Sequence, residues 1–344
     1  ARFGQRKDRI LKGFSNRWHD FPDYILGVTH QIWEGRNIAG LQDWYAPDIP
    51  VRTPMGVALG NQGVIASTLA TLHEFPDRQL LGEDVIWSGS PETHLLSSHR
   101  ILSTGTHTSD GWFGPASNKR FAVRVIADCA ARNDVIDDEW LVRDNGGIVR
   151  QLGGDPRRFA LDLIAREGGP DLAKRPFIPA MDVAGPYQGA GNDDGFGARY
   201  AQTLERIMQG DLAHLLDAYD RAALADHAGA RHLIGAQAIA DSWLSLRAAF
   251  PSAQFRIHHQ IGMDGGMMAP RAALRWSLDG THDGWGAFGA PTGAPVHIMG
   301  MAHAEYGPFG PNGPRADGGL RRECALWDEI AIWKQILLHT GETA

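Results

Sequence analysis

Several features that define particular protein classes are missing from this 344-residue sequence. It has only two cysteines, Cys129 and Cys324, with no C-x-x-C spacing, which excludes a disulfide-rich scaffold and fits buried thiols in a reducing cytoplasm. No apolar run approaches the ~20 residues that span a bilayer, so we expect no membrane partner. The 15 histidines include no H-x-x-x-H or H-E-x-x-H pair, and we therefore expect no bound metal.

An excess of positive charge is lacking too. The formal net charge is −7, the pI is about 6.1 and no basic stripe is evident, so we expect no nucleic-acid partner. Residues 1–10 are basic but contain neither the apolar segment nor the small-residue cleavage site of a secretory signal, and we expect a cytoplasmic protein. With 43% hydrophobic and 21% charged residues, the composition is that of an ordinary globular protein.

The sequence does contain a long internal repeat. Residues 35–128 align without a gap with residues 210–303, at a fixed offset of 175. The alignment resumes at an offset of 184, beyond a hairpin that is nine residues longer in the second copy. Identical pairs include Gly35/Gly210, Phe75/Phe250, Pro76/Pro251, Arg100/Arg275, His107/His282, Phe113/Phe288, Glu139/Glu323 and Asp144/Asp328. A period this long indicates tandem domains, because the units of a solenoid run only ~20–50 residues.

Two domains joined by a linker follow from the repeat. The length alone favours about two domains of ~150 residues. We place the first domain, which ends in a helical extension over 144–166, at residues 1–166, and the second domain at residues 194–344. Residues 167–193 are rich in Gly, Pro and Ala and are predicted to be the linker.

Apolar periodicity predicts that helices precede strands in each copy. In the first copy we expect helices at 21–34, 37–44 and 61–72, and strands around 48–53, 78–88, 94–107, 119–131 and 134–143. In the second copy we expect helices at 194–208, 211–218 and 231–249, strands at 253–263, 269–281, 294–306 and 319–328, and a terminal helix. Residues 307–318 are predicted to be a mobile loop. Helices followed by a run of antiparallel strands indicate an α+β fold.

Four segments make each copy similar to the SnoaL-like polyketide cyclase family, a branch of the nuclear-transport-factor-two-like superfamily. They are EGRNIAGLQDWYAPD at 34–48, EFPD at 74–77, GTH before an FG turn at 105–114 and 280–289, and IDDEWLVRD at 136–144, echoed by LRRECALWD at 320–328. The resemblance covers about residues 21–153 and 195–340. It rests on the order and the duplication of the four segments.

The resemblance implies a fold and a general chemistry. Each copy is expected to be a cone-shaped α+β barrel, in which helices wrap a curved antiparallel sheet around a pocket. Because family members often pair sheet to sheet, we expect an internal pseudodimer, and a homodimer of the whole chain stays open. The family chemistry is acid–base catalysis without a cofactor, such as aldol cyclisation of polyketide esters. Relatives isomerise ketosteroids, open epoxides, dehydrate or only bind ligands, so the fold alone does not fix the function.

One departure from the family pattern concerns catalysis. In the cyclases, a carboxylate that acts as general acid and base follows the Trp of the penultimate strand. The corresponding residues here are Leu141, after Trp140, and Ala325, after Cys324, and neither can carry a proton. The histidine that the cyclases place one strand earlier maps near Asp128 in the first copy and His303 in the second. The cyclase mechanism therefore does not transfer unchanged.

Two pairs of residues are the candidate catalytic groups. Asp128 lies in an apolar strand, and Glu139 and Asp137 share the parity that we expect to face the first pocket. Two carboxylates in a dry pocket can titrate apart and serve as acid and base, whereas a salt bridge with a nearby arginine is the structural alternative. In the second copy, His303 and Glu323 occupy the corresponding places and can act as a base oriented by a carboxylate.

The candidate substrate-binding residues are aromatic or cationic. Core packing is the alternative for the tryptophans, an ion pair with Glu139 or Glu323 for the two arginines, and a turn for the histidine of the second copy. Trp87 and Trp112 are the preferred ligand-wall residues. The full set is Trp33, Trp87, His99, Arg100, Trp112, Arg275 and His282.

Two functions from different classes remain open at this point. The first is a cofactor-free acid–base enzyme, a cyclase, isomerase or hydrolase that acts on a small carbonyl, ester or epoxide compound. The second is a non-catalytic small-molecule-binding or scaffold protein. Loss of the family carboxylate favours binding, whereas retention of Asp128, Glu139, His303 and Glu323 favours catalysis.

Overall fold

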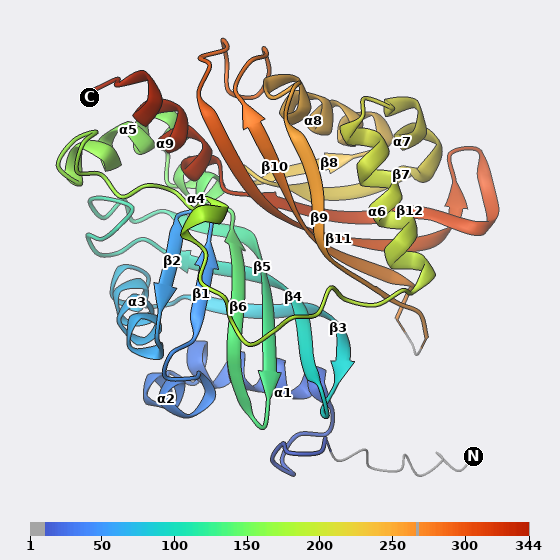
Figure 1. The fold of residues 1–344 in the computed structure, drawn as a ribbon, viewed down its shortest axis with the longest axis horizontal. Helices are drawn as coiled ribbons and strands as arrows, with labels where there is room; N and C mark the ends of the chain where they lie inside the picture. Colours follow the sequence, from blue (N-terminus) through green and yellow to red (C-terminus); the bar gives the residue numbers. More distant parts are fainter. Residues whose placement is uncertain (1–10, 266–267, 344) are drawn as a thin grey trace.

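Two six-stranded sheets, each with its own helices, make up the fold in the computed structural model, which describes residues 11–265 and 268–343 (Figure 1). The strand orders are β2-β1-β6-β5-β4-β3 and β8-β7-β12-β11-β10-β9, so the second sheet repeats the first strand for strand. Both sheets are curved but neither closes on itself. The predicted α+β class with two tandem units is confirmed.

In the first domain, helices lie before and after the long strands in the sequence. The leading helices are α1 (Phe21–Trp33), η1 (Ile38–Gly40), α2 (Leu41–Trp44) and α3 (Asn61–Glu74). The strands are β1 (Pro50–Thr53), β2 (Gly56–Leu59), β3 (Gln79–Ser90), β4 (His94–Thr106), β5 (Arg120–Arg132) and β6 (Val135–Arg143). The helices α4 (Asn145–Gln151) and α5 (Pro156–Arg166) follow, and η2 (Pro179–Met181) lies in the segment that leads to the second domain.

The second domain has the same plan, although three of its strands are longer than their counterparts in the first domain and two are shorter. Its helices are α6 (Gly195–Met208), α7 (Leu212–Ala218), α8 (Ala236–Ala249) and α9 (Glu329–Thr340). Its strands are β7 (Tyr219–His227), β8 (Arg231–Ile234), β9 (Gln254–Met263), β10 (Arg271–Thr281), β11 (Pro295–Gly310) and β12 (Gly313–Trp327). Side-chain capping explains several helix starts: Asp20, Asp144, Asp155 and Asp328 each accept a backbone N–H of the following first turn.

Four details differ from the elements predicted from sequence. The helix predicted at 231–249 is shorter, because β7 and β8 form a small hairpin before α8. The predicted loop 307–318 is mostly the paired ends of β11 and β12. The extension after residue 144 is two helices, α4 and α5, separated around Gly153. The sheets are mixed, because β1 pairs with β6 and β7 with β12 in parallel, which a linear pattern of apolar residues does not reveal.

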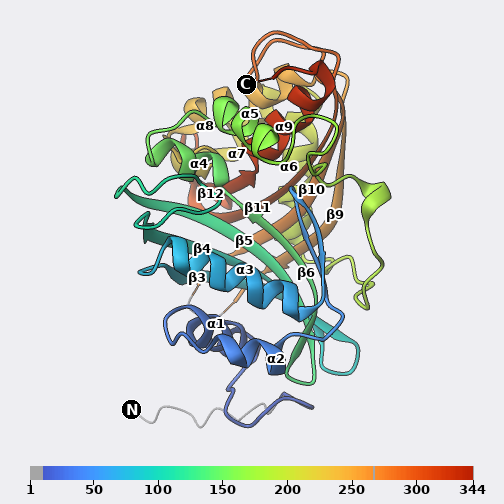
Figure 2. The ribbon, with the colours of Figure 1, turned by 90° about the vertical axis from the view of Figure 1, so that its left-hand side faces the viewer.

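One face of each sheet packs against the other sheet, and the helices cover the opposite face. Figure 2 shows α1 and α3 lying across the first sheet, away from the second domain. Apolar side chains of both sheets meet between the domains, among them Ile126, Val142, Met301 and Leu326. This arrangement is the internal pairing of the two copies that the family habit suggested.

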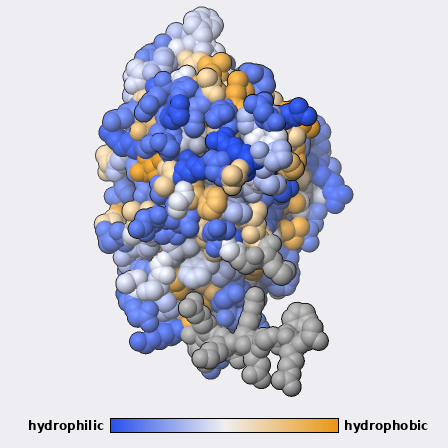
Figure 3. Space-filling view, turned by 90° about the vertical axis from the view of Figure 1, so that its right-hand side faces the viewer, coloured by the Kyte–Doolittle hydropathy of each residue, from blue (hydrophilic) through white to orange (hydrophobic). Residues whose placement is uncertain are grey.

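Polar side chains dominate one face of the molecule. The face shown in Figure 3 is largely hydrophilic, and its apolar side chains form small scattered groups. No helix within the described ranges, 11–265 and 268–343, combines the length and hydropathy that a bilayer span requires.

Candidate active site

A cavity of about 240 Å³ lies inside the first domain, between the sheet and helices α1 and α3. Most of its wall is aliphatic, with Ile25, Val28 and Ile32 from α1 facing Ala127 and Leu141 of the sheet. A few polar side chains interrupt this wall: Thr29, Tyr45, Thr53, Ser67, Thr68, His99, Glu139 and Arg143. A small apolar cavity with few polar groups is the usual form of a small-molecule site, although this one is below the ~300–1,000 Å³ of drug-sized pockets.

Glu139 is the acidic group of this cavity. Its side chain is 6% exposed, and its Oε2 atom has no hydrogen-bond partner among the described residues. Burial raises the pKa of Glu139 to about 7, although the nearby Tyr45 hydroxyl and the charge of Arg143 act in the opposite direction. A carboxyl group with a pKa near 7 can both take up and release a proton at neutral pH.

His99 provides a second titratable group in the same cavity. Burial lowers its pKa to about 4, so its imidazole is neutral at pH 7, and Nε2 has no hydrogen-bond partner among the described residues. Burial raises the pKa of the Tyr45 phenol far above its ordinary value, so this hydroxyl stays protonated and available as a donor. The cavity therefore combines one carboxyl group near its pKa with two neutral polar groups.

Strand alternation places Glu139 in the cavity and Asp128 outside it. Cys129 pairs with Glu139 and Asp128 with Trp140 across β5 and β6, so Asp128 and Glu139 point to opposite faces of the sheet. The prediction that the two carboxylates share a pocket is wrong for this reason. Asp137 also leaves the cavity face, because a β-bulge between β5 and β6 shifts the register there, and its carboxylate lies 2.6 Å from His94 Nε2.

Asp128 belongs to the contact between the domains. It lies 3.6 Å from the Arg275 guanidinium; burial raises its pKa, and the charge of Arg275 and the nearby Ser98 hydroxyl act in the opposite direction. Ser98 Oγ is also 2.9 Å from Nε2 of His303, which is fully buried. His303 and Glu323, predicted to act together, are therefore not brought together, because His303 faces the first domain across the interface.

Both arginines at the repeated position lie at the interface and do not pair with the predicted glutamates. Arg100 binds Glu83 of its own domain and Glu305 of the second domain, at 3.1 and 2.9 Å. The Arg275 guanidinium stacks 3.6 Å from the ring centroid of Trp140. These contacts hold the two sheets together and place neither guanidinium in the first cavity.

The predicted wall residues divide between two cavities and the core. Trp33 and His99 line the first cavity, and Trp112 lines a second one at the domain junction. Trp87 packs edge-on against Phe21 and is absent from both walls. His282 closes a turn, with its Nδ1 atom 3.0 Å from Thr292 Oγ1, as the structural alternative stated.

Glu323, the repeat partner of Glu139, has a different environment. Its oxygens receive the hydroxyls of Tyr200 and Tyr219 at 2.7 and 2.6 Å and the indole N–H of Trp243 at 3.1 Å, and His227 Nε2 lies 2.7 Å away. Burial raises the pKa of Glu323, but the hydrogen bonds from His227 and the two tyrosines outweigh burial and hold it below the ordinary value. This carboxylate is saturated and structural.

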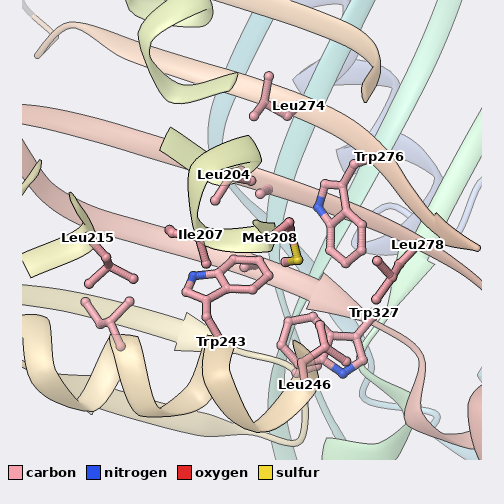
Figure 4. Packing of buried hydrophobic residues seen from close by; sticks show 14 of the residues in the cluster. Leu204, Ile207, Met208, Leu215, Trp243, Leu246, Leu274, Trp276, Leu278 and Trp327 are labelled. Atoms are coloured by element: carbon pink, nitrogen blue, oxygen red, sulfur yellow. The ribbon is translucent and has the colours of Figure 1, made fainter. Parts of the chain in front are cut away.

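Three tryptophans fill the interior of the second domain at positions that line the first cavity. Strand register and the repeat align Trp243 with Thr68, Trp276 with Ile101 and Trp327 with Arg143. All three indoles are at most 1% exposed, and their ring centroids lie 5.7–6.4 Å apart (Figure 4). Gly300 makes room for them, because a Cβ there would collide with the Trp276 indole.

Sequence reasoning missed Tyr45 and the pocket-facing role of Arg143. Both residues lie inside the segments that carried the family resemblance, and Arg143 follows Glu139 by four positions, which puts it on the same face of β6. That parity was a usable signal, whereas the approach of Tyr45 to Glu139 depends on a bridge to Ile136 that no sequence pattern shows. Within the described ranges, no three His, Cys, Asp or Glu side chains converge to hold a metal ion.

Both halves of the chain match models of known protein families. The family described as SnoaL-like polyketide cyclase matches residues 23–152, and that described as SnoaL-like domain matches residues 199–306. No curated protein matches the chain. Similar solved structures include wild-type IdmH of Streptomyces antibioticus, described as a candidate polyketide cyclase, at 23% identity over 38% of this chain and 97% of its own, with TM-score 0.33. TsrD of Streptomyces laurentii is 21% identical over 38% and 93%, with TM-score 0.33.

Proposed function

Because the chain belongs to the SnoaL-like family, with two copies of the domain in tandem, we propose that its first domain is a cofactor-free acid–base enzyme for a small carbonyl compound. One observation carries the proposal. The Glu139 carboxyl group faces an apolar cavity, its Oε2 atom has no hydrogen-bond partner among the described residues, and burial raises its pKa to about 7. A buried acidic group in this state is destabilising, and such groups occur more often at functional sites than elsewhere.

The chemistry that this group supports is proton transfer at a carbon next to a carbonyl. Ionised Glu139 takes the proton from that carbon, the electron pair moves onto the carbonyl oxygen as an enolate, and the proton then returns to a carbon or an oxygen of the product. The nearby Tyr45 hydroxyl lowers the pKa of Glu139 and so favours the ionised form. His99 is neutral and can donate to or accept from the substrate, depending on its tautomer. Isomerisation and intramolecular aldol cyclisation both fit this sequence.

Glu139 would replace the carboxylate that the family carries two residues later. Leu141 points into the same cavity, because residues two apart on a strand share a face. The proton-transferring group thus moves along β6 by one pleat, about 6–7 Å, while it keeps the same pocket. The second domain has no counterpart of this arrangement, since Glu323 already binds four side chains.

Binding without catalysis is the second candidate function. The loss of the family carboxylate at Leu141 and Ala325 favours it, and an apolar cavity of this size can hold a ligand without transforming it. The two functions differ in whether Glu139 moves a proton.

Hydrogen–deuterium exchange tests proton transfer without knowledge of the natural substrate. A panel of aryl ketones and aryl-acetic esters is incubated with the protein in D₂O, and loss of the α-hydrogen signal is followed by proton NMR. We expect the wild-type protein to accelerate exchange for some members, and Glu139→Gln to slow it by ~10²-fold or more. The rate should rise with pH through about 7, as Glu139 ionises.

Glu323→Gln is the matched control, because it removes the same group at the same repeat position in the filled domain. Per folded molecule, its exchange rate should equal that of the wild type. If ligands bind to the wild-type protein but exchange is equally slow with and without Glu139, the protein is a binding protein and the catalytic proposal is wrong.

A further inference from the structure

A second cavity, of about 580 Å³, lies at the junction of the two domains and adjoins the first. We call it the vestibule. Four residues line both cavities: Thr53, Ser67, Leu141 and Arg143. The vestibule and the Glu139 cavity therefore adjoin along these side chains.

The vestibule exists because the second domain packs against the first. One side carries Glu74 and Arg78, from the end of α3 and the turn that follows it. The other side carries Lys334 of α9, together with Glu167 and Lys174 from the segment between the domains. A single SnoaL-like domain would lack this second side.

The carboxylates of the vestibule already have partners. Glu74 accepts the backbone N–H groups of Trp112 and Phe113, at 3.1 and 2.7 Å. Glu167 accepts from Lys334 at 2.5 Å. Asp328 caps α9 and accepts from the Asn145 amide at 2.6 Å, and burial raises its pKa to about 7.

Two arginines of the vestibule have no such partner. Neither Arg78 nor Arg143 makes an ion pair within 4 Å with any described residue, and Arg143 makes no side-chain hydrogen bond to one either. Arg78 is only 4% exposed and is held by aromatic rings, with its guanidinium 5.4 Å from the Phe121 ring centroid and 5.7 Å from that of Trp33. Its one side-chain hydrogen bond, from Nε, goes to Ser103 Oγ at 3.2 Å.

Arg78 is buried and Arg143 is half-buried, and the two cations repel each other while neither has an ion-pair partner within 4 Å among the described residues. Burial and the nearby charge of Arg143 lower the pKa of Arg78 to about 9, and burial also lowers the pKa of Arg143. Guanidinium groups bind carboxylate and phosphate oxygens through paired N–H donors. An anion between the two arginines would therefore relieve their repulsion and satisfy their free donors.

We propose that the vestibule binds an anionic group of the substrate, a carboxylate or a phosphate, through Arg78 and Arg143. The substrate would then extend past Thr53 and Leu141 and present its carbonyl end to Glu139. This inference rests on the proposed function for its catalytic meaning, while the anion site itself is independent of it. It also gives the second domain a role, since α9 closes the vestibule.

Binding of three related probes tests the site. The probes are 2-naphthoate, 2-naphthyl phosphate and the neutral 2-naphthamide, and their Kd values are measured by calorimetry at constant ionic strength. We expect at least one anionic probe to bind about tenfold or more tightly than the amide. A charge-assisted hydrogen bond to an arginine supplies enough binding free energy for this difference. The anion that binds more tightly shows whether the site prefers a carboxylate or a phosphate.

Variants locate the preference and separate it from catalysis. Arg78→Gln and Arg143→Gln should each abolish most of the anion preference and leave amide binding unchanged, whereas Arg78→Lys should restore part of it. Arg120→Gln, an exposed arginine outside the vestibule, should retain it, and so should Glu139→Gln. Equal Kd values for all three probes with folded wild-type protein, or an anion preference that survives both arginine variants, would overturn the proposal. Loss of exchange activity alone would not affect it.

Discussion

The first domain encloses a cavity of about 240 Å³ around Glu139, whereas the same region of the second domain is occupied by three tryptophans around Glu323. The backbone plan is the same in both, down to the strand order. In one copy the glutamate keeps an unbonded oxygen and its pKa is raised, and in the other four side chains bind it and its pKa is lowered. The same residue at the same repeat position is therefore a reactive group in one context and a structural one in the other.

This difference indicates a division of labour between the copies. A hollow interior has fewer packing contacts, because the atoms that line an unfilled space lack neighbours on one side. The second domain regains such contacts with Trp243, Trp276 and Trp327, and it packs its sheet against that of the first domain. We infer that the filled copy supports the hollow one and supplies α9 to the vestibule.

Truncation of one of the three tryptophans that fill the second domain should cause the largest change in the free energy of unfolding. Trp243→Ala should lower the free energy of unfolding by about 3–5 kcal/mol, because it removes a buried indole and leaves Glu323 without one donor. Thr68→Ala, at the matching position of the hollow domain, should change it by less than ~1 kcal/mol. Urea unfolding of the two variants measures both. Similar losses in the two would show that the first cavity is as tightly packed as the second core.

Neutralising the two glutamates should have opposite consequences. Glu323→Gln should lower the free energy of unfolding by about 2–4 kcal/mol, because an amide cannot accept from all four groups that surround the carboxylate. Glu139→Gln should be neutral or stabilising, since it removes a buried acidic group that has one unbonded oxygen. Thermal and urea unfolding near pH 7.5 test the pair. A destabilised Glu139→Gln protein would reassign Glu139 to a structural role.

The ionisation of Glu139 should make the free energy of unfolding depend on pH. Its folded pKa of about 7 lies above the ordinary unfolded value, so the folded state binds the proton more tightly. Protonated Glu139 therefore contributes fully to the free energy of unfolding below the unfolded pKa. This contribution falls as the pH rises towards 7, by at most about 1.4 kcal/mol per pH unit. The Glu139→Gln variant lacks this loss, so its stability relative to wild type should rise between about pH 4.5 and 7 and then level off. A difference that is flat with pH would contradict the raised pKa.

A change at the shared interface should affect both copies slightly. Ser98→Ala removes the hydroxyl that lies 2.9 Å from His303 Nε2, and it should lower the free energy of unfolding by about 1 kcal/mol. Because the sheets pack together, we expect one unfolding transition to shift, by the same amount for probes in either domain. Hydrogen exchange of β10 amides reports on the second domain, and hydrogen exchange of β5 amides reports on the first. Separate transitions would mean that the filled copy does not stabilise the hollow one.

The repeat and the order of helices and strands were enough to predict the tandem α+β fold, and four short segments with their duplication carried the resemblance to the family. Those features are local or periodic, and they depend on apolar spacing, on Gly and Pro at turns and on helix caps such as Asp20 and Asp155. The family matches at 23–152 and 199–306 confirm the resemblance. The parallel pairing of β1 with β6 and of β7 with β12 was missed, because it joins segments far apart in the chain.

The candidate site depended more on tertiary structure. Glu139 and His99 were identified from sequence and do line one cavity, yet Asp128 was paired with Glu139 wrongly. Strand alternation specifies that neighbouring residues face opposite sides, but only the pairing of β5 with β6 decides which residues of different strands share a side. The sequence alone determined that the chain has two copies with a glutamate at the same place. Only packing decided that one of these glutamates faces a cavity and the other is fully bonded, because that outcome depends on side-chain volumes contributed by several distant elements.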